Sequence, residues 1–424
     1  MKKVLLLSAF LVVASFVNSQ ILKKIADRAK NRAENKTNEK VDTKVDQTVD
    51  SAFSKTEKGI KDATKGNENN TEKEGNGNGN NSELEKSASI KVYSKYDFIS
   101  GEKIIVYEDF MQDAVGDLPD KWNTNSAGET VTLEGKPGHW FMLTKPGVFM
   151  PDFIDSLPEN FTLEFDVFAD APAHSWGITT VMAQLNDRNK PEDWRKAVNS
   201  FALNMLPGVD GNGSSEYERT KNSTGEAPTK TQISHFKDVI KPVHVSIWRQ
   251  KERLRVYLNE DKTWDVPKAI LPEAKLNAVV FEMQLTDNWH FLITNIRLAT
   301  GAPDTRNKIL TQNKWVTHGI LFDVNSATIK PESYGTLKEM ANVLKEISDL
   351  KVKIVGHTDA DGNDVSNLDL SKRRADAVKD MLTKEFGIDA SRMETDGKGE
   401  SEPIDNNTTP AGKANNRRVE FIKI

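Results

Sequence analysis

The chain has no cysteine among its 424 residues. It therefore forms no disulfide bonds, and it cannot carry the lipid that lipoproteins attach to a cysteine at the cleavage site. Basic excess is also missing, because the formal net charge is −5, so general affinity for nucleic acid is not expected. Beyond the N-terminus, no apolar run approaches the roughly 20 residues of a membrane-spanning helix. Any attachment to a membrane is then expected to be noncovalent or absent.

Signals for catalysis and for cofactors are missing as well. No His/Asp/Glu cluster has metal-ligand spacing, and His174, His235 and His244 stand isolated in the sequence. No nucleophile elbow is present. The glycines of the stretch 75–81 match no phosphate-binding loop, because no strand pattern precedes them and no Gly-Lys-Ser/Thr follows. The sequence therefore predicts no catalytic residues, no metal and no cofactor.

The length predicts two or three domains, and the N-terminus has the pattern of an export signal. Lys2 and Lys3 form a positive region, residues 4–17 form a short apolar run, and residues 17–19 supply a cleavage pattern that leaves Gln20 as the first mature residue. We expect residues 1–19 to be a cleaved signal peptide. The alternative, a membrane anchor, needs a longer apolar run.

Residues 20–64 are highly charged and carry a thin apolar stripe at helical spacing. The stripe consists of Ile21, Ile25, Ala29, Val41, Val45, Val49 and Phe53. It predicts an amphipathic helical arm that forms a coiled coil, lies on a membrane surface or stays a frayed, solvated helix. Residues 65–89 are rich in Gly, Asn and Glu and predict a flexible, disordered linker.

Residues 90–302 predict an all-β domain, because apolar and polar residues alternate there with period two. The apolar positions are Phe161/Leu163/Phe165/Val167, Val243/Val245/Ile247, Leu254/Val256/Leu258, Phe281/Met283/Leu285 and Leu292/Thr294/Ile296/Leu298. The polar stretch 249–253 predicts a hairpin turn between two of these strands. Many short strands with one apolar face predict an antiparallel β-sandwich.

This middle region resembles, more weakly, the concanavalin/laminin-G type of jelly roll. The resemblance rests on residues 108–110, 118–122 and 256–259, and it implies a glycan-binding or purely structural module. A transmembrane β-barrel is an alternative, because barrel strands alternate too. The polar insertions at 186–199 and 207–232 favour the sandwich.

An enzymatic alternative exists because glycosidases use the jelly-roll fold with paired carboxylates. Glu164 and Asp166 share one strand face, but Phe168 stands where the third acid of a Glu-x-Asp-x-Glu pattern would be. Glu282, next to Gln284, offers a single carboxylate. We interpret these acids as part of a solvated polar face, and the domain as noncatalytic.

Residues 303–424 change to alternating strands and helices. Strands are predicted at 319–322, 352–355 and 419–422, and helices at 331–347 and 366–386. Ser366 with Asp369 predicts a capping box for the second helix, and Gly387 suits the position after its end. The pattern predicts a compact α/β domain of βαβαββ order.

An acid and a base stand 15 residues apart in this domain, Asp359 just past a strand and Arg374 on the following helix. Loops at strand ends commonly carry function, and a guanidinium holds a carboxylate through two parallel hydrogen bonds. One acid and one base suit a zwitterionic ligand and therefore indicate binding. The alternative is a surface salt bridge between the two side chains, worth at most about 1 kcal/mol.

The last domain resembles the OmpA-like peptidoglycan-binding domain. The matching residues are Phe322-Asp323-Val324-Asn325 with Ile329 and Pro331, Gly356-His357-Thr358-Asp359, Asn367, Leu370-Ser371, Arg373-Arg374-Ala375, Gly397-Lys398-Gly399-Glu400-Ser401 with Pro403, and Asn416-Arg417-Arg418-Val419-Glu420. The resemblance implies a domain that grips the diamino acid at the third position of the peptidoglycan stem peptide.

By this resemblance, Asp359 accepts the ammonium of the ligand and Arg374 pairs with its carboxylate. Asn325, Asn367 and Arg417 line the same pocket. The implied partner is peptidoglycan with a diaminopimelate-type stem peptide.

We therefore expect a noncatalytic protein of a Gram-negative cell envelope, periplasmic and associated with the outer membrane. Its C-terminal domain would bind the cell wall, while the β-sandwich would bind a glycan or an outer-membrane protein. One alternative is a wall-localised, glycan-active enzyme with catalysis in the sandwich. The other is an outer-membrane β-barrel protein with a periplasmic OmpA-like domain.

Overall fold

The structure is a computed structural model that describes residues 96–170, 177–206, 213–232, 241–284, 290–301 and 305–424. The predicted signal peptide (1–19), helical arm (20–64) and linker (65–89) lie outside the described residues. All described residues belong to one compact unit, Asn80–Ile424. Within them, none of the helices has both the length and the apolar character to cross a membrane.

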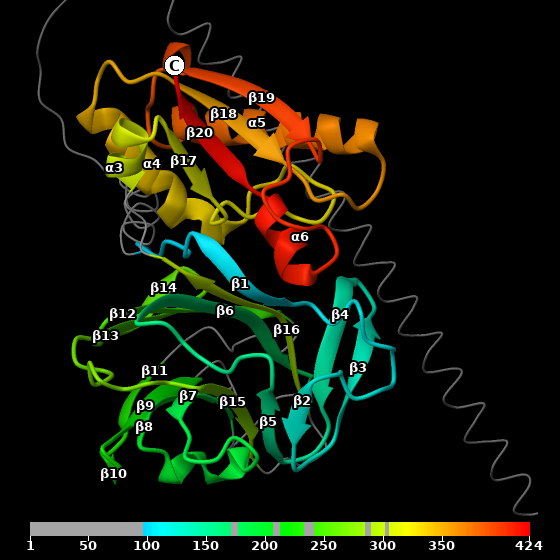
Figure 1. The fold of residues 1–424 in the computed structure, drawn as a ribbon, viewed down its shortest axis with the longest axis vertical. Helices are drawn as coiled ribbons and strands as arrows, with labels where there is room; N and C mark the ends of the chain where they lie inside the picture. Colours follow the sequence, from blue (N-terminus) through cyan, green and yellow to red (C-terminus); the bar gives the residue numbers. More distant parts are fainter. Residues whose placement is uncertain (1–95, 171–176, 207–212, 233–240, 285–289, 302–304) are drawn as a thin grey trace, which may run out of the picture. The chain divides into compact units, whose positions relative to one another are not determined.

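The middle region forms two antiparallel sheets, which confirms the predicted β-sandwich (Figure 1). The first sheet has the order β14 (Asp261–Val266), β13 (Arg253–Leu258), β12 (Val243–Gln250), β6 (Asn160–Ala169), β16 (Phe291–Thr300), β4 (Lys136–Leu143) and β3 (Gly128–Leu133), with β1 (Lys103–Glu108) also paired to β16. The second has the order β10 (Thr224–Gly225), β9 (Ser214–Lys221), β8 (Asn199–Leu206), β7 (Ile178–Gln184), β15 (Ala278–Met283), β5 (Gly147–Pro151) and β2 (Trp122–Thr124), with β11 (Thr229–Gln232) on β9. A short 3-10 helix, η1 (Pro191–Lys196), lies between β7 and β8.

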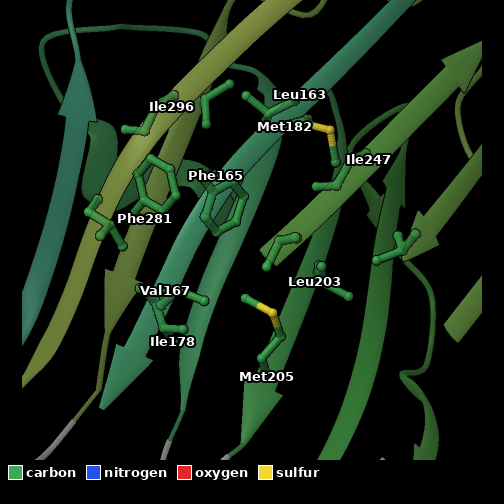
Figure 2. Close-up of a cluster of buried hydrophobic side chains, with 14 of the residues drawn as sticks. Leu163, Phe165, Val167, Ile178, Met182, Leu203, Met205, Ile247, Phe281 and Ile296 are labelled. Atoms are coloured by element: carbon green, nitrogen blue, oxygen red, sulfur yellow. The ribbon is translucent and has the colours of Figure 1, made fainter. Parts of the chain in front are cut away.

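The main apolar core lies between the two sheets (Figure 2). Alternate residues of β6, including Leu163 and Phe165, point into it as the alternation predicted. The rings of Phe165 and Phe281 meet edge to face, with centroids 5.3 Å apart. Full burial of a phenylalanine side chain stabilises a fold by about 1.5–3 kcal/mol, so such pairs hold the sheets together.

The predicted hairpin is confirmed, whereas the alternation in β16 is wrong in its first half. β12 and β13 are joined by a two-residue turn in which Lys251 has φ 53°, the left-handed region. In β16 the strand register shifts at Asn295, which has φ 54°. Because this bulge inserts one residue, Ile293 and Ile296 both face the core and Leu292 faces outward.

The polar face of β6 is not solvated, contrary to the prediction. Glu164 is only 2% exposed, and it accepts hydrogen bonds from Ser100 Oγ and from Arg297 Nη2, both at 2.8 Å. Arg297 also donates from Nη1 to the carbonyl oxygen of His318 at 2.8 Å. Burial alone would raise the pKa of Glu164, but Arg297 and His244 lower it to about 2. Glu164 is therefore a buried structural carboxylate.

His244 on β12 lies between two acids of β6. Its Nδ1 is 2.7 Å from Asp166 Oδ1, and its Nε2 is 3.5 Å from Glu164 Oε2. Burial alone would lower the pKa of His244, but the neighbouring acids, with Asp166 first and Glu164 next, raise it to about 10. His244 is thus a cation at neutral pH and offsets part of the buried negative charge.

We expect the substitution His244→Asn to destabilise the protein in a pH-dependent way. Folding raises the pKa of His244 from 6.5 to about 10, so its stabilisation is fully present below pH 6.5 and is lost as the pH rises through 10. The difference in melting temperature between wild type and variant should therefore shrink across this window. Thermal unfolding followed by circular dichroism at successive pH values measures it. A difference that stays constant across the window would contradict this role of His244.

The C-terminal region is a four-stranded mixed sheet with helices packed on it (Figure 1). The strand order is β17 (Lys314–Thr317), β20 (Val419–Lys423), β18 (Val352–His357) and β19 (Met393–Gly399), of which only β18 and β19 pair in parallel. The helices are α3 (Thr305–Thr311), α4 (Tyr334–Glu346), α5 (Asp364–Lys384) and α6 (Pro410–Asn416), with short 3-10 turns η4 (Pro331–Ser333) and η5 (Ala390–Arg392). The predicted alternation of strands and helices is confirmed, but the predicted βαβαββ order is wrong at its end, because α6 lies between β19 and β20; α3 is a further addition before β17.

Three further details of this domain were predicted wrongly. The strand expected at 319–322 is instead the preceding segment, Lys314–Thr317, and Phe322 forms only an isolated bridge with Ile329. The second helix begins earlier than expected, because the side chain of Asn363 accepts hydrogen bonds from the backbone N–H groups that follow it. The helix also ends two residues earlier than expected, at Lys384, and Gly387, with φ 69°, lies in the left-handed region shortly after it.

Helix α6 of the C-terminal domain contacts strand β1 of the sandwich. The side chain of Asn415 imitates a neighbouring strand: its Oδ1 accepts from the N–H of Ile104 at 3.0 Å, and its Nδ2 donates to the carbonyl of Ile104 at 2.9 Å. Ala414 packs with Ile104 and Ala299 in one buried cluster. His318 Nε2 donates to the carbonyl of Asn415 at 2.9 Å. Strand β1 is therefore fixed by both domains.

Candidate functional site

The predicted site residues Asp359, Arg374 and Arg417 lie around the end of β18. Asp359 follows this strand, Arg374 lies in the middle of α5, and Arg417 precedes β20. Asp359 is 8% exposed, and its Oδ2 accepts a hydrogen bond from Arg417 Nη1 at 2.5 Å. Among the described residues, Asp359 forms its ion pair with Arg417 and not with Arg374.

Arg374 has a different environment. Its Nε donates to the carbonyl of Ser326 at 2.9 Å, and its guanidinium lies over the ring of Phe322, 4.9 Å from the centroid. No carboxylate of the described residues forms an ion pair with it. Burial and the positive charge of Arg417 lower the pKa of Arg374 to about 10, against the opposing effect of Asp359. Arg374 is still charged at neutral pH, and an added anion would stabilise it.

Asn367 supports the loop after β18 from the first turn of α5. Its Nδ2 donates to the carbonyl of Asp361 at 3.0 Å and to Glu400 Oε2 at 2.6 Å. Lys413 Nζ lies 2.8 Å from Asp361 and holds the same loop from α6. These contacts fix the backbone that carries the carboxylate of Asp359.

Asn325, the remaining predicted residue, lies exposed in a turn near Arg374. It has φ 55°, a left-handed conformation that asparagine tolerates. The turn is closed by a hydrogen bond from the N–H of Ser326 to the carbonyl of Asp323 at 3.1 Å. The same Ser326 presents its carbonyl to Arg374. Asn325 therefore shapes the turn that borders the site.

Sequence reasoning missed two residues of this site. Glu400 belongs to the glycine-rich stretch that carried the family resemblance, and that position was the one signal available for it. Tyr107 belongs to β1 of the sandwich, and its ring centroid lies 5.1 Å from the guanidinium of Arg417. Nothing in the sequence pattern connects Tyr107 with the C-terminal domain.

A small polar cavity of about 150 Å³ lies on the outer face of the second sheet. Its lining includes Glu216, Glu218 and Arg195. Arg195 forms two parallel hydrogen bonds with Glu282, at 2.8 and 2.9 Å, and burial raises the pKa of Glu218. Small-molecule pockets typically have roughly 300–1,000 Å³, so this cavity is smaller than the usual small-molecule site.

The fold and the site thus define an α/β domain with one acid and two guanidinium groups at the end of a strand, an arrangement suited to a small zwitterion. Residues 321–417 match the family model described as "OmpA family". The C-terminal domain is an OmpA family domain.

Known proteins resemble part of the chain. Outer membrane porin F of Pseudomonas aeruginosa is 41% identical over 24% of this chain and 29% of the porin. The probable lipoprotein YiaD of Escherichia coli is 46% identical over 24% of this chain and 47% of its own. The peptidoglycan-binding protein ArfA of Mycobacterium bovis is 30% identical over 47% of this chain and 50% of its own. The matches thus span between about a third and a half of these relatives.

A solved structure matches a similar share of this chain, but nearly the whole of its own. The peptidoglycan-associated lipoprotein of Burkholderia pseudomallei is 26% identical over 28% of this chain and 98% of its own, with a TM-score of 0.25.

Proposed function

We propose that the OmpA family domain binds peptidoglycan through the zwitterionic diamino acid of the stem peptide. In this proposal Asp359 accepts the side-chain ammonium and Arg374 pairs with the side-chain carboxylate, while Asn325, Asn367 and Arg417 line the pocket. The observation that supports it most strongly is the state of Arg374. Its guanidinium is partly buried, lies near a second guanidinium, and forms no ion pair with any described carboxylate.

The proposal describes the chain as a noncatalytic protein of the cell envelope, periplasmic and associated with the outer membrane. The relatives named outer membrane porin F and peptidoglycan-binding protein ArfA support this location and ligand. The sandwich would link the wall to the outer membrane, or to a glycan or protein that it holds. The burial of Glu164 in an ion pair with Arg297 supports the noncatalytic interpretation, because a catalytic carboxylate must reach the substrate.

We expect Asp359→Ala and Arg374→Ala each to abolish retention of the protein on purified peptidoglycan sacculi. Truncating one partner of a hydrogen-bonded charge pair at an interface costs about 2–5 kcal/mol in binding, or roughly 30- to several-thousand-fold. A pulldown from a dilution series measures the retention. Circular dichroism of each variant checks that it has folded.

Arg373→Ala is the matched control for this experiment. Arg373 is the exposed neighbour of Arg374 on α5, where it pairs with Asp369 at 2.7 Å, so its loss should leave retention unchanged. If Asp359→Ala and Arg374→Ala were both retained like the wild type, the proposed site would be wrong.

Stem peptides that differ at the third position test the assignment of Arg374 separately. Lysine has the side-chain ammonium of diaminopimelate but lacks the side-chain carboxylate. The wild type should therefore bind a diaminopimelate peptide more tightly than a lysine peptide, and Arg374→Ala should remove this difference. Equal affinity of the wild type for both peptides would contradict the role of Arg374. Isothermal titration calorimetry with the soluble peptides measures both affinities.

A further inference from the structure

Strand β1 of the sandwich reaches the candidate site through one side chain. The ring of Tyr107 faces the guanidinium of Arg417, with 5.1 Å between the ring centroid and the guanidinium carbon. The same guanidinium donates a hydrogen bond to Asp359 at 2.5 Å. Arg417 is therefore shared between an aromatic face of the sandwich and the carboxylate that is proposed to receive the ligand.

The position of Tyr107 is fixed on several sides. Its backbone pairs with Arg297 of β16, and Asn415 of α6 holds both backbone groups of Ile104 in the same strand. Its hydroxyl lies 3.4 Å from Asn295 Oδ1, at the bulge of β16. The ring thus lies against Arg417 without further ordering, which is the condition for an effective positioning group.

Arg417 has two partners in the structure, the carboxylate of Asp359 and the ring of Tyr107. An ammonium that binds Asp359 competes with the guanidinium of Arg417, which already occupies that carboxylate. Burial alone would lower the pKa of Arg417, but the carboxylate of Asp359 is among the groups that raise it, so Arg417 is a cation at neutral pH. A displaced guanidinium needs another stabilising contact in a partly buried place, and the face of an aromatic ring supplies one.

We propose that Tyr107 is a positioning residue of the stem-peptide site. Its ring retains the guanidinium of Arg417 beside Arg374 when the ligand's ammonium takes Asp359, so that both guanidinium groups face the ligand's carboxylate. This inference rests on the proposed function of the OmpA family domain. It makes the sandwich a part of the binding site, because one of its strands orients a residue of the pocket.

The test uses the full chain and a soluble muropeptide with diaminopimelate at the third position of its stem. Tyr107→Leu should weaken binding roughly two- to thirtyfold, the range expected for loss of one cation–π contact. Tyr107→Phe keeps the ring and loses only the hydroxyl, so it should bind within about twofold of the wild type. Tyr107→Met has nearly the volume of leucine with a different shape, and it serves if the leucine variant does not fold. Calorimetry gives the affinities, and melting temperatures show whether each variant is folded.

A double-variant cycle separates positioning from a merely structural effect. If Tyr107 acts through Arg417, then Tyr107→Leu should cause no further loss in an Arg417→Ala background. An equal loss in both backgrounds, or wild-type affinity of Tyr107→Leu, would overturn this inference while leaving the proposed function intact. Failure of the wild-type protein to bind the muropeptide would instead overturn the proposed function itself.

Discussion

Replacing Arg297 by methionine is expected to lower the free energy of unfolding by about 3–5 kcal/mol, as for other broken buried ion pairs. Arg297 is 6% exposed and donates two hydrogen bonds to Glu164 Oε1, at 2.8 and 3.2 Å. It also donates to the carbonyl of His318 at 2.8 Å. Methionine removes all of these donors. The buried carboxylate of Glu164 then loses its positively charged partner and two of its hydrogen bonds. Urea denaturation followed by tryptophan fluorescence measures the loss.

Two comparisons make this result specific. The exposed pair Arg306–Glu346 has a similar length, 2.9 Å, with both side chains more than half exposed, so Arg306→Met should cost less than about 1 kcal/mol. The double variant Glu164→Leu with Arg297→Met should be more stable than Arg297→Met alone, because it removes the stranded charge. If Arg297→Met were as mild as Arg306→Met, the ion pair would not carry the stability assigned to it.

Replacing Gly356 by alanine is expected to impair both stability and binding. A Cβ at Gly356 would lie 2.2 Å from the carbonyl oxygen of Ser371, so β18 and α5 must move apart. Overpacking of this kind costs about 1–3 kcal/mol and sometimes more. Because Asp359 follows β18 and Arg374 lies on α5, the same movement separates the acid and the base of the site. Retention on sacculi should therefore fall even in the fraction that remains folded.

The control for this prediction is Gly225→Ala. A Cβ at Gly225 meets nothing within 4 Å, so both melting temperature and sacculus retention should match the wild type. If Gly356→Ala behaved like this control, the close approach of β18 and α5 would not be required for the site.

The sandwich strands could be predicted because each has one apolar face and the core covers that face. The sequence could not show which residues cover the polar face of these strands. The apolar and polar residues of β6 alternate in the same way whether Glu164 faces water or pairs with Arg297. The alternation shows that one face of the strand is apolar and the other polar, and it does not show what covers the polar face. A bulge is equally hidden, because the inserted Asn295 looks like any polar residue within the strand.

Short apolar runs misled the prediction in the C-terminal domain. The run at 319–322 is as apolar as a buried strand, but there Ile320 reaches the core from a segment outside the sheet. The actual strand, Lys314–Thr317, has four residues, too few for a periodic signal. Helix α5 could be predicted from its apolar stripe. Its first residue could not, because both Asn363 and Ser366 are residue types that cap helices well.

Asp359 and Arg374 were predicted as site residues from residue type, spacing and family resemblance, and their role stays a prediction. Their partners could not be predicted, because the pairing of Asp359 with Arg417 depends on where two loops meet in space. The contact of Tyr107 with Arg417 was even harder to predict. Tyr107 lies on a strand of the sandwich, whereas Arg417 follows a helix of the C-terminal domain. Ile104 and Asn415, which join that strand to that helix, are 311 residues apart in the chain.

The side chain of Asn415 affects how an edge strand of the sandwich is protected from pairing with other chains. Strand β1 has β16 on one side, and on the other the amide of Asn415 takes the place of a further strand at Ile104. Unpaired strand edges invite association with other chains. Without the C-terminal domain, the backbone groups of Ile104 in β1 would be free to pair with a strand of another chain. In this chain, a side chain of the OmpA family domain occupies the backbone groups of Ile104 that would otherwise be free to pair with another strand.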